Sequence, residues 1–553
     1  MKDQAIVECV PNFSEGRDQA AIQAIGAAVR SVPEVRLLGI DPGADTNRTV
    51  YTFAGPPQAV LDAALAAAKA ARTLIDMRLH KGAHPRIGAL DVCPFIPVSG
   101  ITMEECSALA ERFAEALARD LEVPVYLYDK SARRPGRESL ASIRAGEYEG
   151  LEAKLRDPEW KPDFGPGRFD PRWGATVAGA REFLIAYNVN LNTRDKKQAH
   201  DIALSVREAG RQVREADGSS RQVKGRLQAV RAIGWYIEEF GCAQVSINIL
   251  DYRKTPLSLV FETVKEEAEK RGILVTGSEL VGLIPEAAIL ECGRHFLEKM
   301  GKSPGLPRAI VVDTAIRSLG LSSLGPFDPA KRIVEWAMKD KPELASKDLQ
   351  GFADAVSADT PVPGGGSVSA LAGALGASLA SMVANLTVGK AKPGEAGMDL
   401  AGLALEAQDA RCALMDLVDR DTEAFASVLA ALRLPKSSQE ERDLRDAEME
   451  KANKLAASVP LRSAELCLKT LELCLEAFRR GNPSSFADAL VGALLAQAGF
   501  HGAALNVKVN LDSIRDRDFC VSALKTLETL GARLSSHGDL LAEYVKTAKA
   551  PQA

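Results

Sequence analysis

The segment HKGAHPRIGALD, residues 80–91, holds two of the chain's six histidines. His80 and His84 have the i, i+4 spacing of a zinc-binding helix, but Gly82 lies between them and Pro85 follows, and both residues disfavour a helix. A metallohydrolase site built on this pair is therefore the weaker interpretation. Two others remain open: both histidines are structural groups in a loop, or one of them transfers protons.

His84 is the better candidate for proton transfer. A residue before proline is pushed towards an extended conformation, so Pro85 partly fixes the backbone of His84. A neutral imidazole with a pKa of about 6.5 can take up and return a proton near neutral pH. Arg86 would lie on the same side of an extended chain and could bind a carboxylate. The role of His80 is left as structural.

Two aspartates in GIDPGADTNRT (39–49), Asp41 and Asp45, are candidates to orient the imidazole of His84. Aspartates at the end of a strand are also common as turn or helix-capping residues. The spacing does not separate these alternatives.

A glycine-rich segment, TPVPGGGSVSA (360–370), places Gly364, Gly365 and Gly366 directly before a long predicted helix. Glycines at this place leave the backbone N–H groups at the positive end of the helix open to an anion or a closely packed ligand. The GK[ST] of a P-loop does not follow. The alternative is a flexible turn followed by an N-cap, Ser367.

An acidic residue interrupts an apolar stripe on the helix predicted after Gly394. Asp421 fills the vacant place in a stripe formed by Leu414, Leu417, Val418, Phe425, Val428 and Leu432. A carboxyl buried there without a cation has a raised pKa and can serve as a general acid at neutral pH. The alternative is an Asp421 paired with an arginine at a helix interface.

The composition is typical of a soluble globular protein with several domains. With 553 residues the chain is too long for one hydrophobic core, and about three to five folding units are expected. The net charge of −5 excludes the basic surface of a nucleic-acid-binding protein. The nine cysteines form no CxxC pair and the N-terminus lacks an export signal, so we expect free thiols and a cytoplasmic protein.

The first part of the chain alternates strand-like and helix-like segments, which predicts an α/β sandwich. Strands are expected at 6–13, 35–41, 49–55, 92–98 and 123–128, and helices at 18–32, 57–74 and 102–120. A loop rich in Pro, Gly and Trp (158–175) precedes a second, similar series. Its strands are expected at 183–192, 244–250 and 273–284, and its helices at 197–215, 257–271 and after Pro285.

An all-α domain follows, with long helical segments between Pro393, Pro435, Pro460 and Pro483 that predict helices broken at prolines. The uncharged run 368–384 is interpreted as a tightly packed helix, because it falls short of the roughly 20 apolar residues of a membrane span. The predicted divisions are two α/β subdomains (1–178 and 179–326), a linker (327–348) with an exposed hinge at 339–342, and a helical domain (349–553).

Several long segments resemble known families. The resemblance to the glutamate formiminotransferase family is carried by ECVPNFSEGR (8–17), DTNRTVYTFAGPP (45–57), LIDMRLHKGAHPRIGALDVCPFIPV (74–98), IRAGEYEGL (143–151) and GATVAGAREFLIAYNVNL (174–191). Two further segments resemble the formiminotetrahydrofolate cyclodeaminase family: TPVPGGGSVSALAGALGASLASMV (360–383) and LVDRDTEAF (417–425). In this order, the two sets resemble the bifunctional formiminotransferase-cyclodeaminase family.

The resemblance implies two ferredoxin-like α/β subdomains and a helical bundle that is obligately dimeric and often part of a ring-shaped octamer. It implies transfer of the formimino group of N-formimino-L-glutamate to N5 of tetrahydrofolate, in histidine degradation. It further implies that 5-formiminotetrahydrofolate cyclises to 5,10-methenyltetrahydrofolate with release of ammonia. The alternative is a transferase whose helical domain serves only as an oligomerisation scaffold.

The resemblance also implies site residues. His84 matches the acid–base histidine of the transferase, Asp41 and Arg86 match neighbouring positions, and Asp421 matches the cyclodeaminase carboxylate. The folate-contacting positions match Gly165, Pro166, Gly167, Arg168, Phe169, Asp170, Pro171, Arg172, Trp173, Gly174, Gly225, Arg226 and Leu227. Four aromatic residues are candidates to cover a pterin ring, with ordinary loop packing as the alternative: Trp160, Phe164, Phe169 and Trp173.

Tetrahydrofolate is expected as a carbon-carrying substrate, and no metal is expected, because neither reaction transfers electrons or needs a Lewis acid. One histidine can serve both proton transfers of the first reaction, and a neutral carboxylic acid suits the release of ammonia in the second. Polyglutamated folates carry anionic tails, for which Lys224 and Arg226 are candidate contacts. The expected partners are these small molecules and further copies of the chain, with no nucleic acid and no membrane span.

Overall fold

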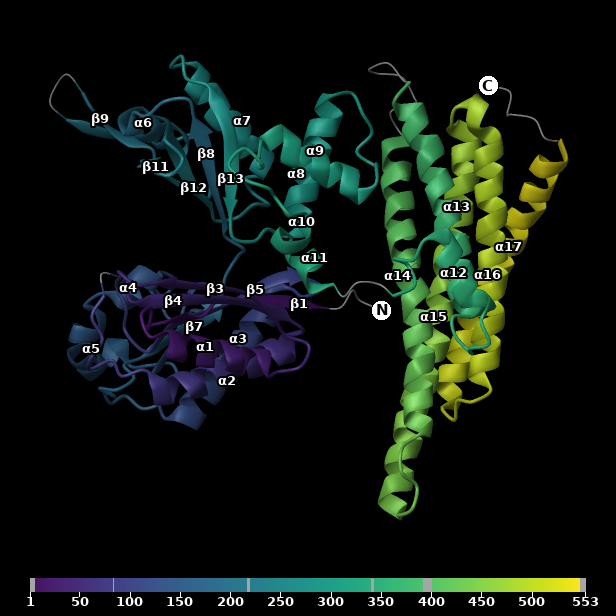
Figure 1. Cartoon of the computed structure of the whole chain (residues 1–553), viewed down its shortest axis with the longest axis horizontal. Coiled ribbons are helices and arrows are strands. Elements are labelled where there is room, and N and C mark those ends of the chain that lie inside the picture. The colour runs from purple at the N-terminus through teal and green to yellow at the C-terminus, as the bar shows by residue number, and fades with distance from the viewer. Residues whose placement is uncertain (1–4, 83, 216–218, 340–342, 391–399, 548–553) are drawn as a thin grey trace. The chain divides into compact units, whose positions relative to one another are not determined.

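The computed structural model describes residues 5–82, 84–215, 219–339, 343–390 and 400–547. The chain divides into two compact units, the first formed by Met1–Glu291 with Leu319–Lys339 and the second by Cys292–Ser318 with Asp340–Ala553. The first unit contains the sheets and the second is helical, which confirms the predicted α/β part followed by an all-α part (Figure 1). Residues 292–318, placed by the sequence analysis in the second α/β subdomain, group with the helical unit.

A seven-stranded mixed sheet builds the N-terminal part of the first unit. Its strands are β1 (Ile6–Cys9), β2 (Asn12–Phe13), β3 (Arg36–Gly43), β4 (Arg48–Gly55), β5 (Leu90–Ser99), β6 (Val125–Leu127) and β7 (Thr176–Ala180). Their order is β1-β4-β2-β5-β7-β6, with β3 paired to β4 and β1 also paired to β5. The pairs β5–β7 and β6–β7 are parallel, and the others are antiparallel.

Three helices cover one face of this sheet: α1 (Gln19–Arg30), α2 (Pro57–Leu74) and α3 (Met103–Leu121) (Figure 1). The Asp18 side chain caps α1, and Thr102 with Glu105 forms a capping box on α3. The core between helices and sheet includes Phe13, Tyr51, Phe53, Phe95 and Phe113, all with no exposed surface. Two short helices, α4 (Leu140–Arg144) and α5 (Glu147–Arg156), precede β7.

The second sheet is antiparallel, in the order β11-β12-β8-β13. Its strands are β8 (Ile185–Leu191), β11 (Val230–Ile237), β12 (Cys242–Ile249) and β13 (Val275–Val281), and its helices are α6 (Lys196–Val206) and α7 (Leu257–Glu269). The helix predicted over 197–215 is wrong beyond Val206. Arg207 is already extended, with a ψ of 147°, and after a turn that ends at Gly210 (φ 62°) the chain continues as a hairpin of β9 (Arg211–Arg214) and β10 (Ser220–Val223).

The helical unit is built on four long helices: α13 (Gly365–Val388), α14 (Leu400–Leu432), α15 (Gln439–Arg480) and α16 (Phe486–Leu511). The shorter α9 (Arg308–Leu319) and α12 (Leu349–Ser357) and the long α17 (Arg517–Thr547) complete it, while α8 (Glu286–Lys299) crosses the unit boundary. Small residues allow close packing of α13, since a Cβ on Gly376 would lie 2.6 Å from the Gly492 carbonyl oxygen. The predicted tightly packed helix is therefore confirmed.

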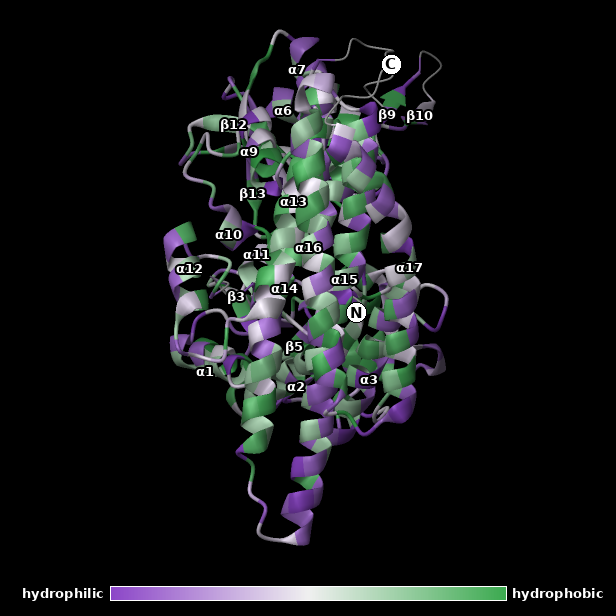
Figure 2. Cartoon of the chain, turned by 90° about the vertical axis from the view of Figure 1, so that its right-hand side faces the viewer, coloured by the Kyte–Doolittle hydropathy of each residue, from purple (hydrophilic) through white to green (hydrophobic). Residues whose placement is uncertain are grey.

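Among the described residues, α13 and the segment Pro483–Leu511 are long and apolar enough to cross a membrane, as their hydropathy colours in Figure 2 indicate. In their most apolar windows, 61% and 44% of the residues are buried within the chain. Core helices of soluble proteins meet the same criteria, so length and composition alone do not indicate a membrane span.

Pro460 does not break a helix, and the prediction that it would is wrong. It lies inside α15, where the missing N–H of proline leaves the carbonyl oxygen of Ala456 without its helical donor. The Asn510 side chain of α16 donates to this oxygen at 2.7 Å. A neighbouring helix thus supplies the hydrogen bond that the proline removes.

The predicted linker contains two short helices, α10 (Pro329–Arg332) and α11 (Val334–Met338). Most of the predicted hinge, 340–342, lies outside the described residues.

Candidate functional sites

His84 lies in the segment between α2 and β5, which packs against the turn between β3 and β4. Position 82 requires glycine, because the backbone of Thr46 lies so close that a Cβ there would overlap the Thr46 carbonyl oxygen. Asn47 fixes the same contact: its side chain donates to the Lys81 carbonyl oxygen at 3.2 Å, and its own carbonyl oxygen lies 2.7 Å from His80 Nε2. Glycine at 82 therefore allows this segment to pack directly against the turn.

The hydrogen bonds of His84 define a neutral imidazole. Its Nδ1 lies 2.7 Å from the Pro85 carbonyl oxygen, which can only accept, so Nδ1 carries the proton. Its Nε2 then carries the lone pair and accepts from an Nη of Arg48. Burial lowers the pKa of His84, and the positive charge of Arg48 lowers it further. The half-buried ring therefore stays neutral at neutral pH and is suited to accept a proton.

Three charged residues beside His84 were not singled out by the sequence analysis: Arg48, Asp91 and Arg144. Asp91 is 1% exposed and pairs with Arg144, and its second oxygen accepts from the Ile87 backbone N–H at 2.9 Å. A charged residue at the start of the buried strand β5 was the available signal. Arg48 and Arg144 carried no comparable signal in the sequence, because they lie on β4 and α4, far from His84 along the chain.

Arg86 does not join His84. Arg86 is 6% exposed, and its guanidinium binds Glu149 through two hydrogen bonds, of 2.9 and 2.6 Å, and Glu147 through one of 3.0 Å. Its Nε lies 3.2 Å from His80 Nδ1. These residues and Tyr148 line a cavity of about 640 Å³. Of the histidine pair, His80 is thus the one linked to Arg86.

Asp41 and Asp45 are both exposed. Asp41 lies in β3 opposite Val50 of β4. No hydrogen bond from either carboxylate to His84 occurs within the described part of the chain. The nearby carboxyl that influences the imidazole is instead Asp91, whose negative charge raises the pKa of His84.

The segment Gly165–Gly174 is an irregular loop before β7. Trp173 is fully buried, and its indole N–H donates to Thr176 Oγ1 at 3.0 Å, so its side chain belongs to the core. The aromatic rings of Phe169 and Tyr148 are 5.5 Å apart. Phe169 and Asp170 line a second cavity, of about 550 Å³, together with Arg72.

The other predicted folate contact, Gly225–Leu227, caps the end of α6. The backbone N–H groups of Arg226 and Leu227 donate to the carbonyl oxygens of Ser205 and Val206, both at 3.0 Å. No hydrogen bond or ion pair joins this segment to the loop 165–174 among the residues that the structure describes.

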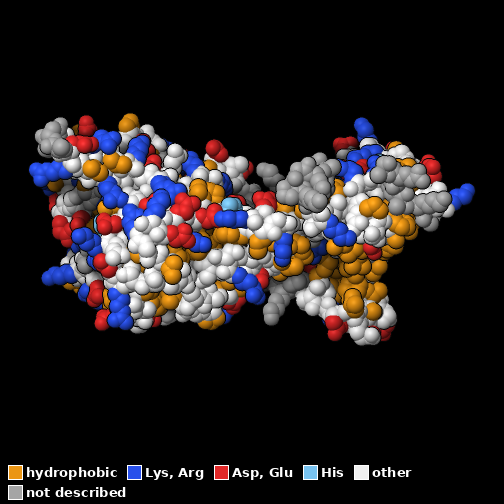
Figure 3. Space-filling view, turned by 90° about the horizontal axis from the view of Figure 1, so that it is seen from above, with side chains coloured by type: hydrophobic (Ala, Val, Ile, Leu, Met, Phe, Trp, Pro, Cys, Tyr) orange, Lys and Arg blue, Asp and Glu red, His pale blue; other side chains and the backbone are white. Residues whose placement is uncertain are grey.

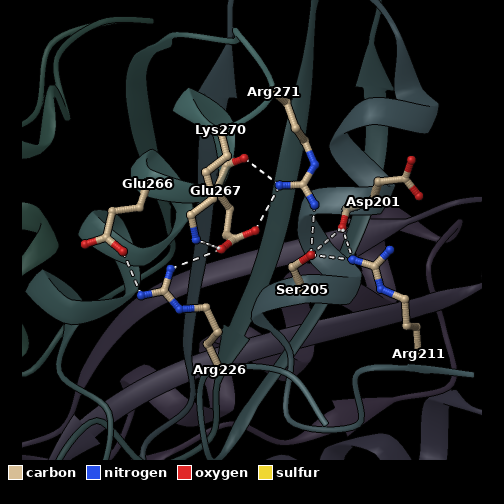
Figure 4. Close-up of polar contacts among 8 residues, drawn as sticks. All are labelled: Asp201, Ser205, Arg211, Arg226, Glu266, Glu267, Lys270 and Arg271. Carbon is tan, nitrogen blue, oxygen red and sulfur yellow. Dashed lines mark hydrogen bonds and ion pairs between the residues drawn. The ribbon is translucent and has the colours of Figure 1, made fainter. Parts of the chain in front are cut away.

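The Arg226 side chain belongs to a cluster around Glu267 (Figure 4). Arg226, Lys270 and Arg271 approach the Glu267 carboxylate at 3.1, 2.6 and 2.9 Å. Burial opposes ionisation of Glu267, but these hydrogen bonds outweigh it and lower its pKa to about 2. Arg226 is therefore already paired, also with Glu266 at 2.7 Å.

The helical unit brings two separately predicted features together. Ser367 Oγ donates to Asp421 Oδ2 at 3.2 Å, and a Cβ on Gly366 would overlap Asp421 Oδ1. The glycine segment at the start of α13 therefore lies directly against Asp421 of α14. Burial raises the pKa of Asp421, opposed in part by hydrogen bonds from the side chain and backbone of Ser367.

Two details of that site differ from the sequence analysis. Helix α13 begins at Gly365 with Gly364 as its N-cap, so Ser367 is not the N-cap; its single hydroxyl proton is shared between the Val418 carbonyl oxygen at 2.8 Å and Asp421 Oδ2 at 3.2 Å. The stripe around Asp421 is buried at Leu414, Leu417 and Val418, but Leu432 is 46% exposed. No arginine forms an ion pair with Asp421 in the described ranges, in contrast to the alternative of an interface pair.

No group of three or more His, Cys, Asp or Glu side chains placed to hold a metal occurs among the described residues. Two separate candidates for proton transfer are therefore present, a neutral histidine in the α/β unit and a half-buried carboxyl in the helical unit.

Comparisons with known proteins identify the family. Residues 6–181 match the formiminotransferase domain, N-terminal subdomain, residues 186–339 the formiminotransferase domain, and residues 348–529 the formiminotransferase-cyclodeaminase family. A formimidoyltransferase-cyclodeaminase of Rattus norvegicus is 46% identical over 517 residues, 93% of this chain and 94% of that protein. The chain therefore belongs to the formimidoyltransferase-cyclodeaminase family.

Two shorter relatives each match one part of the chain. A glutamate formimidoyltransferase of Streptococcus pyogenes is 41% identical over 293 residues, 53% of this chain and 93% of that protein. A methenyltetrahydrofolate cyclohydrolase of Methylorubrum extorquens is 38% identical over 202 residues, 36% of this chain and 97% of that protein.

Proposed function

We propose that this chain catalyses two consecutive reactions of folate. The first transfers the formimino group from N-formimino-L-glutamate to tetrahydrofolate, and the second cyclises 5-formiminotetrahydrofolate to 5,10-methenyltetrahydrofolate and releases ammonia, in histidine degradation. Membership of the family supports both reactions. The observation that carries the second is the contact of Asp421 with Gly366 and Ser367, which a helical scaffold alone would not need.

His84 is the proposed acid–base group of the transferase. When N5 of tetrahydrofolate attacks the amidine carbon, N5 must lose a proton and the departing glutamate nitrogen must gain one. A neutral imidazole can accept the first and return the second. The lowered pKa of His84 supports this role, since it keeps the ring unprotonated before attack. Arg86 and Asp41 remain proposed neighbours of the site.

Asp421 is the proposed acid of the cyclodeaminase. Ring closure by the folate N10 gives a tetrahedral carbon that bears an amino group, and amines leave only after protonation. A carboxyl with a raised pKa is a proton donor at a pH where an ordinary aspartate is ionised. Gly364–Ser367 would then hold the folate beside this carboxyl.

Folate contacts are proposed at Gly165–Gly174 and Gly225–Leu227, and each of the two α/β subdomains is proposed to be ferredoxin-like. Polyglutamated folate is the proposed form of the substrate, and no metal is proposed. Lys224 is exposed and available for an anionic tail, whereas Arg226 already binds Glu266 and Glu267. Lys224 is therefore the stronger candidate of the two.

A cytoplasmic homo-oligomer is also proposed. Apolar side chains remain exposed on two packed helices of the bundle, with Val368 and Leu375 on α13 and Leu505 and Val509 on α16 at 40%, 49%, 64% and 68%. Figure 3 shows hydrophobic side chains gathered on the helical part of the chain. Exposed apolar patches of this kind commonly mark interfaces between subunits.

Separate substitutions test the two-site proposal. His84→Ala should lower transferase turnover by roughly 10²–10⁴-fold and leave cyclisation of supplied 5-formiminotetrahydrofolate unchanged, and Asp421→Ala should do the reverse. Both activities are measured on the same purified full chain, with circular dichroism to verify folding. If Asp421→Ala leaves cyclisation intact, Asp421 is not its acid, whereas a wild-type chain that does not cyclise supplied 5-formiminotetrahydrofolate is a transferase only, with the helical domain as a scaffold.

A further inference from the structure

Arg48 is a partly buried cation with only a neutral partner. It opens β4, and its described hydrogen bond is the one to His84 Nε2. Its Nε is buried and has no hydrogen-bond partner among the described residues, and no carboxylate lies within ion-pair distance of it there. A buried charge without a counter-charge is unfavourable, so this arrangement is incomplete without an anion.

A second guanidinium adds to this excess charge. Arg144 ends α4, its side chain is 14% exposed, and it pairs with the buried Asp91. Its Nε is also buried and without a partner in the described part of the chain. The positive charge of Arg144 contributes to lowering the pKa of Arg48, so the two cations are close enough to repel. With His84 neutral, two cations face one carboxylate, which leaves one positive charge uncompensated.

We propose that Arg48 and Arg144 bind the α-carboxylate of the amino-acid substrate beside His84, and that Asp91 is a positioning residue that holds Arg144 for this contact. The inference rests on the proposed transferase function and names the part of its substrate that the site recognises. One uncompensated charge matches one carboxylate. Arg48 touches the His84 ring itself, and the α-carboxylate is separated from the formimino nitrogen by a single carbon. The γ-carboxylate lies two carbons further along the side chain.

This contact would couple substrate binding to exposure of the base. In the free protein, Arg48 occupies the Nε2 lone pair with which His84 would accept a proton. A carboxylate forms stronger, charge-assisted hydrogen bonds with a guanidinium than a neutral ring nitrogen does. The arriving substrate therefore draws Arg48 away and frees Nε2. The charged groups that act on His84 are Arg48 of β4, Arg144 of α4 and Asp91 of β5.

Steady-state kinetics of Arg48→Gln and Arg144→Gln in the full chain test the assignment. The KM for N-formimino-L-glutamate should rise about 100-fold, with a smaller change in kcat and an unchanged KM for tetrahydrofolate. N-formimidoylglycine, which has only the α-carboxylate, should show the same loss of kcat/KM, whereas 4-(formimidoylamino)butanoate should be little affected. Added guanidinium ion should partly restore Arg48→Ala. The matched control is Arg156→Gln, an exposed arginine of α5, which should behave as the wild type.

Three results would overturn the inference: an unchanged KM for the amino-acid donor, equal losses with both analogues, or a change confined to the KM for tetrahydrofolate. The wild type is assayed first. If it does not transfer the formimino group, the proposed function fails, whereas an active wild type with unaffected Arg48→Gln rejects this inference alone.

A measurement on the unmodified chain guards against variants that do not fold. The protein is labelled with ¹³C at histidine, and the His84 resonance is identified by its loss in His84→Gln. Bound L-glutamate brings a negative charge to the site and occupies Arg48, so the pKa of His84 should rise when glutamate is added. Addition of 4-aminobutanoate, which lacks the α-carboxylate, should not raise it. No rise at saturating glutamate would contradict the inference.

Discussion

In the α/β unit the candidate proton-transfer group is an imidazole, and in the helical unit it is a carboxyl. Burial shifts both pKa values, downwards for His84 and upwards for Asp421. Each shift favours the uncharged form, because burial penalises a charge of either sign. The uncharged imidazole is a base and the uncharged carboxyl is an acid, so one physical effect prepares the two sites for opposite tasks.

The two sites differ in their neighbours. His84 lies among charged side chains, with Arg48 in contact and Arg144 and Asp91 nearby. Asp421 lies against a glycine and a serine, and no cation forms an ion pair with it among the described residues. The first environment is suited to recognise an anionic substrate, whereas the second favours the protonated form of a carboxyl. The surroundings of His84 therefore favour anion binding, and those of Asp421 favour an acidic proton donor.

Crowding at the histidine site should give the largest effect. In Gly82→Ala the new Cβ would overlap the Thr46 carbonyl oxygen, a backbone atom that cannot rotate away, so the segment that carries His84 must shift. We expect transferase activity to fall about 100-fold and the free energy of unfolding by about 1–3 kcal/mol, with cyclisation retained. Kinetics and urea unfolding measure both.

The control for this variant is Gly150→Ala in α5, where the Cβ meets no atom within 4 Å. It should keep both activities and leave stability unchanged or slightly raised. If Gly82→Ala lowers both activities equally in a folded protein, the two sites are not separate.

Crowding at the carboxyl site should give a smaller effect. In Gly366→Ala the new Cβ would overlap Asp421 Oδ1, the end of a side chain that can rotate. We expect cyclisation to fall roughly 10-fold or more while transferase activity stays unchanged, because the carboxyl must leave its place beside Ser367. Gly402→Ala on α14, with open space around the Cβ, is the matched control. Unchanged cyclisation in a folded Gly366→Ala would show that the position of Asp421 does not matter.

The smallest effect is expected from a substitution in the scaffold of the helical unit, away from both candidate sites. Asn510→Ala removes the donor to the Ala456 carbonyl oxygen beside Pro460, and we expect a loss of about 1 kcal/mol in the free energy of unfolding with both activities retained. Urea unfolding measures the change. In a Pro460→Ala background, the restored backbone N–H can donate to Ala456, so Asn510→Ala should then have less effect. An equal effect in both backgrounds would reject the account of this proline.

The sequence alone predicted most elements of the fold but not the contacts between distant segments. Periodicity located α1, α2, α3 and the core helix α13, because a buried face imposes its spacing on the local sequence. The continuous helix through Pro460 was missed, since the donor that permits it, Asn510, lies on another helix. The hairpin after Val206 was missed because its polar residues continue the pattern of the preceding helix.

The candidate sites were predictable to a similar degree. His84, Asp421 and the glycines at 364–366 stood out by residue type and position, but the contact between Asp421 and Gly366 joins two different helices. Arg48, Asp91 and Arg144 come from β4, β5 and α4, and only the folded sheet brings them to His84. Arg86 was expected beside His84 because it lies two residues further along an extended segment. In the structure it instead pairs with acidic residues in 147–149 and donates to His80.

The pH dependence of the two reactions, measured on one preparation of the full chain, tests the central claim most directly. Values of kcat/KM report the free enzyme. The proposed base is neutral His84, so transferase activity should be present at neutral pH and fall as the pH drops through the lowered pKa of that ring. The proposed acid is protonated Asp421, so cyclisation should be present at low pH and fall as the pH rises through the raised pKa of that carboxyl. Opposite limbs are predicted, and two profiles that fall in the same direction would contradict the account.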